Sequence, residues 1–410
     1  MEFSPQQDRA LKAVDRWYKQ GDSQVFYLAG YAGTGKTTLA KHLAEGIGDV
    51  MFAAYTGKAA HVLRNKGCDG ASTIHSLIYR SRDKSKAHLD ELNRQLAVLR
   101  EELRELPPKI FEQHPKVRRL IKEIDEETEN VSQPMFSLNT ESIVKDLDLL
   151  VIDECSMVDE RMGEHLLSFK TPILVLGDPA QLPPPGGAGY FTETQPDFML
   201  DEVHRQAAES PILRMATKVR NGESLEIGDW GEDCHVIPKG VKLSPEQVLS
   251  FDQLLVGKNV TRHATNMKVR KLHDIHEKYP VIGDRLVCLR NNTELGLLNG
   301  AIFNVTDVTD VLDGKVHMSV RPEDSMESVD VAALEHHFLG RGEELKKQYW
   351  LKSEGQEFDY GYALTVHKSQ GSQWDSVGIF DESGVFRQHR NRWLYTAITR
   401  AAEKVSVIRM

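Results

Sequence analysis

Short, mainly apolar runs recur along the chain, and those in the first half end in a polar or glycine-rich loop. Residues 25–29, 149–152 and 173–176 are the clearest runs in the first half, and residues 377–380 and 405–408 are their counterparts near the end. Runs of this length are typical of strands buried on both faces of a parallel sheet. The pattern therefore predicts an α/β fold with strand–loop–helix units in both halves of the chain.

A helical pattern fills much of the stretch between the first two of these strands, which is far longer than one crossover needs. Its leucines follow the alternating three- and four-residue spacing of a helix seam. They are Leu89, Leu92, Leu96, Leu99, Leu103 and Leu106. Pro107 and Pro108 stop this helix, and a second amphipathic stretch carries Val117, Leu120 and Ile124 on one face. We expect an antiparallel helical hairpin packed on itself.

A second insertion is indicated in the other half of the chain. Strand-like segments at 284–290, 300–308 and 315–320 are separated by turn residues. They predict a small β-structure between residues 283 and 355. A polar helix is expected over 333–349.

Composition and charge limit the classes of protein to which the chain can belong. The 410 residues carry a formal net charge of −10 and are 40% hydrophobic. Because net charge averages over the whole surface, a local groove for nucleic acid stays compatible with it. The 4 cysteines show no CxxC or Cys/His spacing, which favours neither a zinc site nor a disulfide framework. With no signal-peptide pattern and no apolar run of the ~20 residues that a bilayer requires, we expect a cytoplasmic protein.

A glycine-rich loop follows the first apolar run. Residues 30–37, Gly-Tyr-Ala-Gly-Thr-Gly-Lys-Thr, match G-x-x-x-x-G-K-[ST] at every fixed position, and a helical stretch begins directly after them. Such loops turn backbone N–H groups onto nucleotide phosphates at a helix N-terminus. We expect Lys36 to reach the β and γ phosphates of ATP and the Thr37 hydroxyl to bind Mg²⁺.

Acidic and amide side chains follow the next two strands. Asp153 and Glu154 close the run at 149–152, and Gln181 lies in the loop after 173–176. Because loops at the carboxyl ends of parallel strands gather at one edge of a sheet, we expect these side chains near the phosphate loop. Asp153 then binds Mg²⁺ directly or through water, Glu154 polarises the attacking water, and Gln181 senses the γ phosphate.

The phosphate loop, DECSM at 153–157 and GDPAQLPP at 177–184 resemble motifs I, II and III of superfamily 1 helicases. Further resembling motifs follow in order. They are AYTGKAA at 54–60, STIHSL at 72–77, VHRQ at 203–206, YALTVHKSQG at 362–371 and LYTAITRA at 394–401. TGKAA, STIH and VHKSQG resemble subclass B, the 5′→3′ branch with RecD and phage Dda, and the size is closest to the Dda type.

The resemblance implies two RecA-like P-loop NTPase lobes with ATP in the cleft between them. The implied divisions are 1–78 and 141–199 for lobe 1, 79–140 for its helical insertion, 200–282 and 356–410 for lobe 2, and 283–355 for an SH3-like β-barrel insertion. Family members carry a strand-separating pin in the first insertion. Phe136 is a candidate for it, although no hairpin is visible in the sequence there.

Nucleotide contacts are implied residue by residue. Arg205 and Arg400 match the family's arginine fingers, which act when the cleft is closed. Gln7 matches the glutamine that reads adenine, since a carboxamide both donates and accepts; helix capping is the alternative interpretation. The remaining implied contacts are Gly33, Thr34, Gly35, Lys36, Thr37, Thr38 and Gly371.

Contacts to a DNA strand are implied as well. They are Thr56, Lys58, Thr73, His75, Thr365, His367 and Lys368, whose hydroxyl, N–H and cationic groups suit phosphates without reading sequence. Arg262 and Asn266 lie in a basic stretch at 258–270 and are expected to contact DNA or nucleotide, or to lie on a solvated helix face. Trp350, Trp374 and Trp393 are candidates for base stacking, with core packing as the alternative.

These expectations describe an ATP-dependent motor that translocates 5′→3′ on single-stranded DNA and separates duplexes. The expected cofactors are ATP and Mg²⁺, and the expected partners are single-stranded DNA, single-strand/double-strand junctions and single-strand-binding, replication or recombination proteins. We expect a monomer, without membrane association, in a bacterial or phage-infected cell. Two alternatives remain: a translocase that displaces proteins but unwinds poorly, and a RecD-like subunit that docks in a larger complex.

Overall fold

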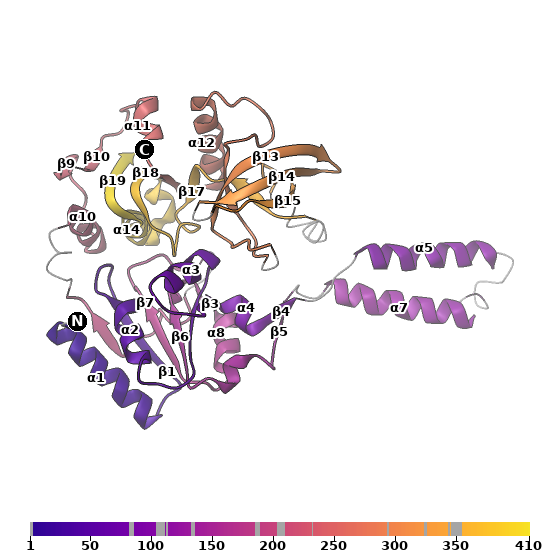
Figure 1. The fold of residues 1–410 in the computed structure, drawn as a ribbon, viewed down its shortest axis with the longest axis horizontal. Helices are drawn as coiled ribbons and strands as arrows, with labels where there is room; N and C mark the ends of the chain where they lie inside the picture. The colour runs from indigo at the N-terminus through magenta and orange to yellow at the C-terminus, as the bar shows by residue number, and fades with distance from the viewer. Residues whose placement is uncertain are drawn as a thin grey trace.

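Two sheet-centred lobes and two insertions make up the molecule (Figure 1). The computed structural model describes residues 3–81, 86–103, 111, 114–132, 136–184, 189–202, 210–231, 233–292, 295–323, 326–342, 345 and 355–410. Within these ranges no helix combines the length and the apolar character that a membrane crossing needs.

Lobe 1 is built on a 6-stranded parallel sheet in the order β3-β2-β6-β7-β1-β8. Its strands are β1 (Val25–Gly30), β2 (Val50–Ala54), β3 (Ser72–Thr73), β6 (Leu149–Asp153), β7 (Ile173–Gly177) and β8 (Phe198–Leu200). Its helices are α1 (Pro5–Gln20), α2 (Lys36–Ala44), α3 (Gly57–Asn65), α4 (Ile74–Ile78), α8 (Glu160–Leu167) and the 3₁₀ turns η1 (Ile143–Asp146) and η2 (Cys155–Met157). The three predicted strands of this half are confirmed. They are apolar throughout because two hydrophobic clusters cover the sheet on opposite faces.

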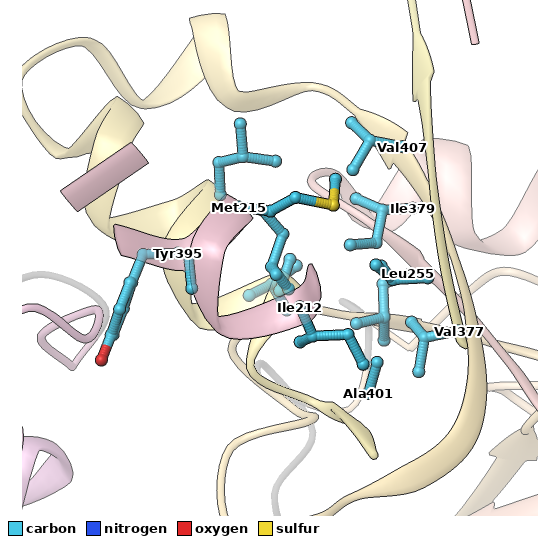
Figure 2. Close-up of a cluster of buried hydrophobic side chains, with 14 of the residues drawn as sticks. Ile212, Met215, Leu255, Val377, Ile379, Tyr395, Ala401 and Val407 are labelled. Atoms are coloured by element: carbon cyan, nitrogen blue, oxygen red, sulfur yellow. The ribbon is translucent and has the colours of Figure 1, made fainter. Parts of the chain in front are cut away.

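Lobe 2 contains a second 6-stranded sheet in the order β17-β11-β18-β19-β10-β9, parallel except for the antiparallel edge strand β9. Its strands are β9 (Gly228–Gly231), β10 (Cys234–Ile237), β11 (Gln253–Val256), β17 (Ala363–Thr365), β18 (Trp374–Asp381) and β19 (Ala401–Arg409). Its helices are α10 (Pro211–Arg220), α11 (Pro245–Leu249), α12 (Asn259–Leu272), η4 (Ser383–His389) and α14 (Arg390–Ile398). Figure 2 shows Ile212 and Met215 of α10 facing Leu255, Val377 and Ile379 of the sheet.

The first insertion is a two-helix arm that stands away from the body of the molecule (Figure 1). It consists of α5 (Lys86–Glu102) and α7 (Pro115–Ser132), joined to lobe 1 through the antiparallel strands β4 (Tyr79–Ser81) and β5 (Phe136–Leu138). Leu92, Val117 and Leu120 are buried along the seam, which confirms the predicted helical hairpin. Leu106 and the two prolines lie outside the described residues. Phe136 begins β5 opposite Ser81, at the base of the arm, and its role as a pin stays a prediction.

The second insertion is a 5-stranded antiparallel sheet in the order β15-β14-β13-β12-β16. Its strands are β12 (Arg285–Cys288), β13 (Ile302–Leu312), β14 (Lys315–Pro322), β15 (Val329–Leu334) and β16 (Phe358–Tyr360). Because β16 pairs with β12, the insertion extends beyond the predicted boundary at residue 355. The predicted helix over 333–349 is wrong in its first part, because β15 continues to Leu334 and turns occupy 335–340, whereas Leu345 is helical.

A buried ion pair fixes this β insertion to lobe 2. Arg270 of α12 donates from Nε to Asp284 Oδ1 at 2.9 Å and from Nη2 to Asp284 Oδ2 at 2.8 Å. It also donates to the Glu277 and Tyr279 carbonyl oxygens at 2.7 and 2.9 Å. An arginine satisfied in this way tolerates burial, so the insertion is held firmly against α12.

Candidate functional site

The phosphate loop joins β1 to α2 and takes a conformation that requires glycine. Gly33 and Gly35 both have φ of 79°, in the left-handed region. A Cβ at Gly30 would lie 2.7 Å from Thr34 Oγ1 and 2.9 Å from Leu200 Cβ. Glycine is therefore required at positions 33 and 35 for the backbone conformation and at position 30 for lack of space.

The two predicted metal ligands lie side by side. The Thr37 hydroxyl, in the first turn of α2, donates to Asp153 Oδ2 at the end of β6 at 2.8 Å. The Lys36 ammonium donates to the Gly30 and Tyr31 carbonyl oxygens at 2.6 and 3.2 Å. A hydroxyl beside a carboxylate is the oxygen donor set that Mg²⁺ takes at nucleotide phosphates, so the residues present fit this ion.

Glu154 follows Asp153 with φ of 53°, an unusual conformation for a residue other than glycine. Burial raises the pKa of this carboxyl, and the Asp153 charge acts in the same direction. The charges of Arg400 and Lys36 oppose this shift. A carboxyl with a raised pKa is a better proton acceptor when ionised, which suits the predicted role in polarising water.

Three further predicted catalytic residues come from both lobes: Gln181 from lobe 1, and Arg400 and Arg205 from lobe 2. Arg400, 6% exposed, donates to the Thr396 and Ser372 carbonyl oxygens at 3.2 Å each, and its charge acts on Glu154. Gln181 is buried, and its Oε1 has no hydrogen-bond partner among the described residues. Arg205, the other predicted finger, lies outside the described residues.

A cavity of about 550 Å³ opens between these elements. Its lining includes Gln7, Gly33, Gly35, Lys36, Thr37, Thr38, Asp153, Glu154 and Gly371. The structure thus brings most of the predicted nucleotide contacts to one space, whereas Gln181 and Arg400 are not among its lining residues. Thr34 is buried within the loop, where its hydroxyl donates to the Tyr31 carbonyl at 2.9 Å. Phe3, Lys66 and Gln373 also line the cavity, although they lie outside the motifs that predicted the site. An apolar residue next to Ser4-Pro5 was the available signal for Phe3.

Gln7 serves as a capping residue and also contacts the phosphate loop. The Ser4 N–H donates to Gln7 Oε1 at 3.0 Å, and the Gln7 N–H donates to Ser4 Oγ at 3.2 Å, which completes a capping box on α1. Gln7 Nε2 donates to the Thr34 carbonyl at 3.1 Å. The capping alternative is therefore confirmed, and the adenine contact stays a prediction.

The predicted strand contacts of lobe 1 lie at the starts of α3 and α4. Thr56 and Thr73 cap these helices, each accepting at 3.1 Å from a backbone N–H, that of Ala59 and of Ser76. Lys58 is half-buried in the first turn of α3.

His75 lies between two tyrosine rings. Its centroid is 5.5 Å from that of Tyr55 and 5.6 Å from that of Tyr79. Burial lowers the pKa of His75, so its imidazole is neutral at neutral pH.

In lobe 2, the predicted contacts follow β17. Thr365 is buried, and its carbonyl accepts from the Lys368 N–H at 2.9 Å. His367 packs against Phe386 with ring centroids 5.7 Å apart. The Lys368 side chain reaches solvent at the end of this turn.

Two predicted contacts prove to be interior residues. The Asn266 amide donates to the Tyr360 and Ala363 carbonyls at 3.0 and 3.2 Å and accepts from the Ala363 N–H at 2.7 Å. It is 1% exposed, so neither a strand contact nor a solvated face describes it. Arg262 is also buried, with Nη2 2.7 Å from Asp359 Oδ2, so it does not lie on a solvated face either. Both side chains hold α12 against β16 and β17.

The tryptophan candidates divide between core and edge. Trp393 is fully buried and stacks on Phe386 at 5.6 Å, which confirms core packing. Trp374 is half-buried at the start of β18, and Trp350 lies outside the described residues.

Lobe 2 and the β insertion both touch α3. A Cβ at Gly371, whose φ is 76°, would lie 2.8 Å from Ala59 Cβ. A Cβ at Gly57 would lie 2.7 Å from Leu298 Cβ of the β insertion. Lobe 2 and the β insertion therefore contact α3 beside the nucleotide cavity, whose lining includes Ala59 and Gly371.

The sheet order, the phosphate loop and the facing second lobe define a P-loop NTPase fold with two RecA-like lobes. Residues 2–240 match the family described as AAA domain, and residues 360–408 match the UvrD-like helicase C-terminal domain. The chain belongs to this AAA-domain family and, with its relatives, to the superfamily 1B helicases of the RecD/Dda type.

Two curated relatives illustrate this membership. The chain is 27% identical to the ATP-dependent RecD2 DNA helicase of Deinococcus radiodurans, over 93% of its own length and 46% of that protein. It is 29% identical to the ATP-dependent DNA helicase dda of Enterobacteria phage T4, over 58% of its own length and 45% of that protein. It spans less than half the length of either relative.

Solved structures of Pif1 helicases share the fold. One, from work on two Pif1 helicases at forked double-stranded DNA, aligns with a TM-score of 0.57 at 17% identity over 99% of this chain and 92% of that chain. Another, Bacteroides Pif1 bound to single-stranded DNA, gives 0.54 at 17% identity with the same coverage of 99% and 92%. At this identity the likeness concerns the fold alone.

Proposed function

We propose that this chain is an ATP-dependent motor that translocates 5′→3′ along single-stranded DNA and separates duplex DNA. One observation carries the proposal. Lys36, Thr37, Asp153 and Glu154 of lobe 1 line a single cavity together with Gly371 of lobe 2, and the Arg400 charge acts on Glu154. Such an arrangement makes hydrolysis depend on how the two lobes are placed.

The residues around the cavity have different proposed roles in ATP hydrolysis. The loop N–H groups and Lys36 hold the phosphates of ATP, and Thr37 and Asp153 hold Mg²⁺. When bound, this ion supplies charge neutralisation at the phosphates. Glu154 accepts a hydrogen bond from the attacking water, and Gln181, in the loop after β7, is the proposed sensor of the γ phosphate. Arg400 stabilises negative charge that develops on the transferred group, a role that contributes roughly 10³–10⁵ in rate.

The proposed DNA strand runs across both lobes beside this cavity. Thr56, Lys58, Thr73 and His75 contact it from lobe 1. Thr365, His367 and Lys368 contact it from lobe 2. Since Gly371 packs on α3, closure of the cleft around ATP brings these two sets together and its opening separates them. Repeated closure and opening then moves the strand stepwise.

The relatives support the finer parts of the proposal. RecD2 and Dda are both described as ATP-dependent DNA helicases. Superfamily 1B membership favours 5′→3′ movement, and single-stranded DNA and single-strand/double-strand junctions are the proposed substrates. We assign the antiparallel β insertion to the SH3-like type. The proposed setting is a monomer in the cytoplasm of a bacterial or phage-infected cell, without membrane association and with single-strand-binding, replication or recombination proteins as partners.

A second candidate function is a RecD-like subunit or protein-displacing translocase that needs partners for unwinding. The projecting arm favours it, because a two-helix element held away from the body is suited to docking (Figure 1). Gel filtration of the chain alone, combined with DNA-stimulated ATPase, separates the candidates. A docking subunit should be inert by itself.

The central experiment is ATP-dependent strand displacement on matched duplexes with a 5′ or a 3′ single-stranded tail. We expect displacement from the 5′-tailed duplex alone. Lys36→Ala serves as the control, with turnover lowered by roughly 10²–10³-fold or more and single-strand binding retained. Displacement from the 3′ tail would refute the polarity, and brisk ATPase without displacement would favour the second candidate.

A further inference from the structure

The phosphate loop is bonded to lobe 2 through a tyrosine hydroxyl. The Ala32 N–H donates to the Tyr395 phenol oxygen at 3.0 Å, and that phenol donates to Asp178 Oδ2 at 2.7 Å. Tyr395 and Asp178 are each 1% exposed. Because an amide N–H can only donate and a carboxylate can only accept, the single phenol proton must point to Asp178. One hydroxyl therefore joins the phosphate loop to the loop that carries Gln181.

Neighbouring contacts join the same parts of the two lobes. The Leu182 N–H donates to Thr396 Oγ1 at 2.9 Å, and Gln370 Nε2 donates to the Leu182 carbonyl at 2.9 Å. The Arg220 guanidinium lies 3.6 Å over the centroid of the Tyr31 ring. Tyr31 and Ala32 precede the loop residues that line the nucleotide cavity. Lobe 2 thus contacts the first part of the loop, and the later part of the loop faces the cavity.

Tyr395 also belongs to the helix that directly precedes the arginine finger. It lies in α14, and the Thr399 N–H donates to its carbonyl at 3.0 Å. Arg400 Nε donates to the carbonyl of the adjacent Thr396 at 3.2 Å. Figure 2 shows the Tyr395 ring at the rim of the lobe 2 core with its oxygen pointing away from the cluster. The ring packs α14 into lobe 2, and its hydroxyl binds α14 to lobe 1.

We propose that Tyr395 is a positioning residue that fixes the place of Arg400 relative to Glu154 by bonding α14 to the phosphate loop. This inference rests on the proposed ATPase. The hydroxyl takes no part in the chemical step. It holds α14 against Ala32 and Asp178, so any movement of the loop around bound phosphates is passed to Arg400. Burial and the Asp178 charge raise the pKa of Tyr395 well above its ordinary value, so the phenol keeps its proton at neutral pH.

The variant Tyr395→Phe removes the hydroxyl and keeps the packed ring. We expect kcat for DNA-stimulated ATP hydrolysis to fall roughly 10- to 100-fold, because small misplacements of a catalytic group have effects of this size. KM for ATP should change by less than about threefold, since the groups that hold the phosphates are intact. Tyr27→Phe is the matched control. Tyr27 is 2% exposed and its phenol has no hydrogen-bond partner among the described residues, so its kcat should equal wild type.

A double-mutant cycle with Arg400→Ala tests whether Tyr395 acts through the finger. Single-turnover rates should show little further loss when Tyr395→Phe is added to Arg400→Ala, because the residue that Tyr395 places is already gone. Losses that multiply would overturn the inference. If Tyr395→Phe fails to fold, Thr396→Val breaks the neighbouring bond to Leu182 and should show the same loss and the same lack of additivity.

The outcomes separate this inference from the function on which it rests. Absence of ATPase activity in the wild-type chain would contradict the proposed function itself. An active wild type with an equally active Tyr395→Phe would leave that function standing and remove only the role of the hydroxyl.

Discussion

At the residue scale, the charge of Lys368 is set by what surrounds it. Its side chain reaches solvent, yet desolvation by the protein around it and the Arg262 charge lower its pKa to about 8. Asp359 and Glu357 act in the opposite direction. A lysine with this pKa is mostly cationic below pH 8 and mostly neutral above it. A DNA phosphate beside it favours the cationic form and is bound less well once the proton is lost.

Single-strand affinity should therefore fall as pH rises from about 7 to 9. We expect a loss of roughly tenfold, since a hydrogen bond to a charged group contributes about that much. Lys368→Arg should flatten the profile because arginine stays charged. Fluorescence anisotropy of a labelled oligonucleotide at fixed salt measures this. Lys268→Arg, at an exposed lysine of α12, should keep the wild-type profile; an unchanged profile in Lys368→Arg would remove Lys368 from the strand contacts.

Single residues also show what the sequence could and could not predict. Thr37 and Asp153 were predictable, because short motifs fix Thr37 in the loop and helix that follow β1 and Asp153 at the end of β6, and parallel strands bring those ends together. Asn266 was not, since its partners Tyr360 and Ala363 lie 94 and 97 positions away and only tertiary packing buries it. The bond between Ala32 and Tyr395 spans 363 positions. Roles that depend on such distant partners leave no local pattern.

At the element scale, the helices of the arm could be predicted from the local sequence, whereas the strands at its base could not. The leucine spacing predicted its helices because a seam of this kind is encoded within each helix. The strands β4 and β5 were missed, since each has only 3 residues and they pair across the whole arm. The arm meets the body at this narrow base, so its stability is expected to depend on its own seam.

Shortening one side chain of the seam tests that independence. Leu92 is 4% exposed, and Leu92→Ala should lower the stability of the arm by about 2–5 kcal/mol while the body keeps its ATPase activity. Hydrogen exchange followed by mass spectrometry should show faster exchange in α5 and α7 alone. Val98, 59% exposed, provides the control, and Val98→Ala should change stability by less than about 0.5 kcal/mol. Loss of protection throughout lobe 1 would mean that arm and body unfold as one unit.

At the scale of the whole molecule, three parts meet on α3. Its N-terminal turn carries Thr56 and Lys58, Gly371 of lobe 2 packs on Ala59, and Leu298 of the β insertion packs on Gly57. Two glycines at these contacts permit the close approach, because a side chain at either would occupy the space of its neighbour. A movement of lobe 2 or of the β insertion would therefore act directly on α3, the helix that is proposed to hold the strand.

Gly57→Ala should disturb this arrangement without disturbing lobe 1. The added Cβ would lie 2.7 Å from Leu298 Cβ and 3.2 Å from Leu298 Cα, so the β insertion has to move away. Overpacking of this kind costs about 1–3 kcal/mol, and we expect single-strand affinity to weaken roughly tenfold, measured by anisotropy. At Gly46 a Cβ meets nothing within 4 Å, so Gly46→Ala should bind as wild type.

A second-site change distinguishes a contact effect from a general loss of fold. Leu298→Gly removes the Cβ that the new methyl group would strike, so adding it to Gly57→Ala should restore most of the affinity. Restoration would show that the β insertion acts on the strand through its seat on α3. If the double variant binds as weakly as Gly57→Ala, the loss arises within α3 itself, and the β insertion has no part in gripping the strand through this contact.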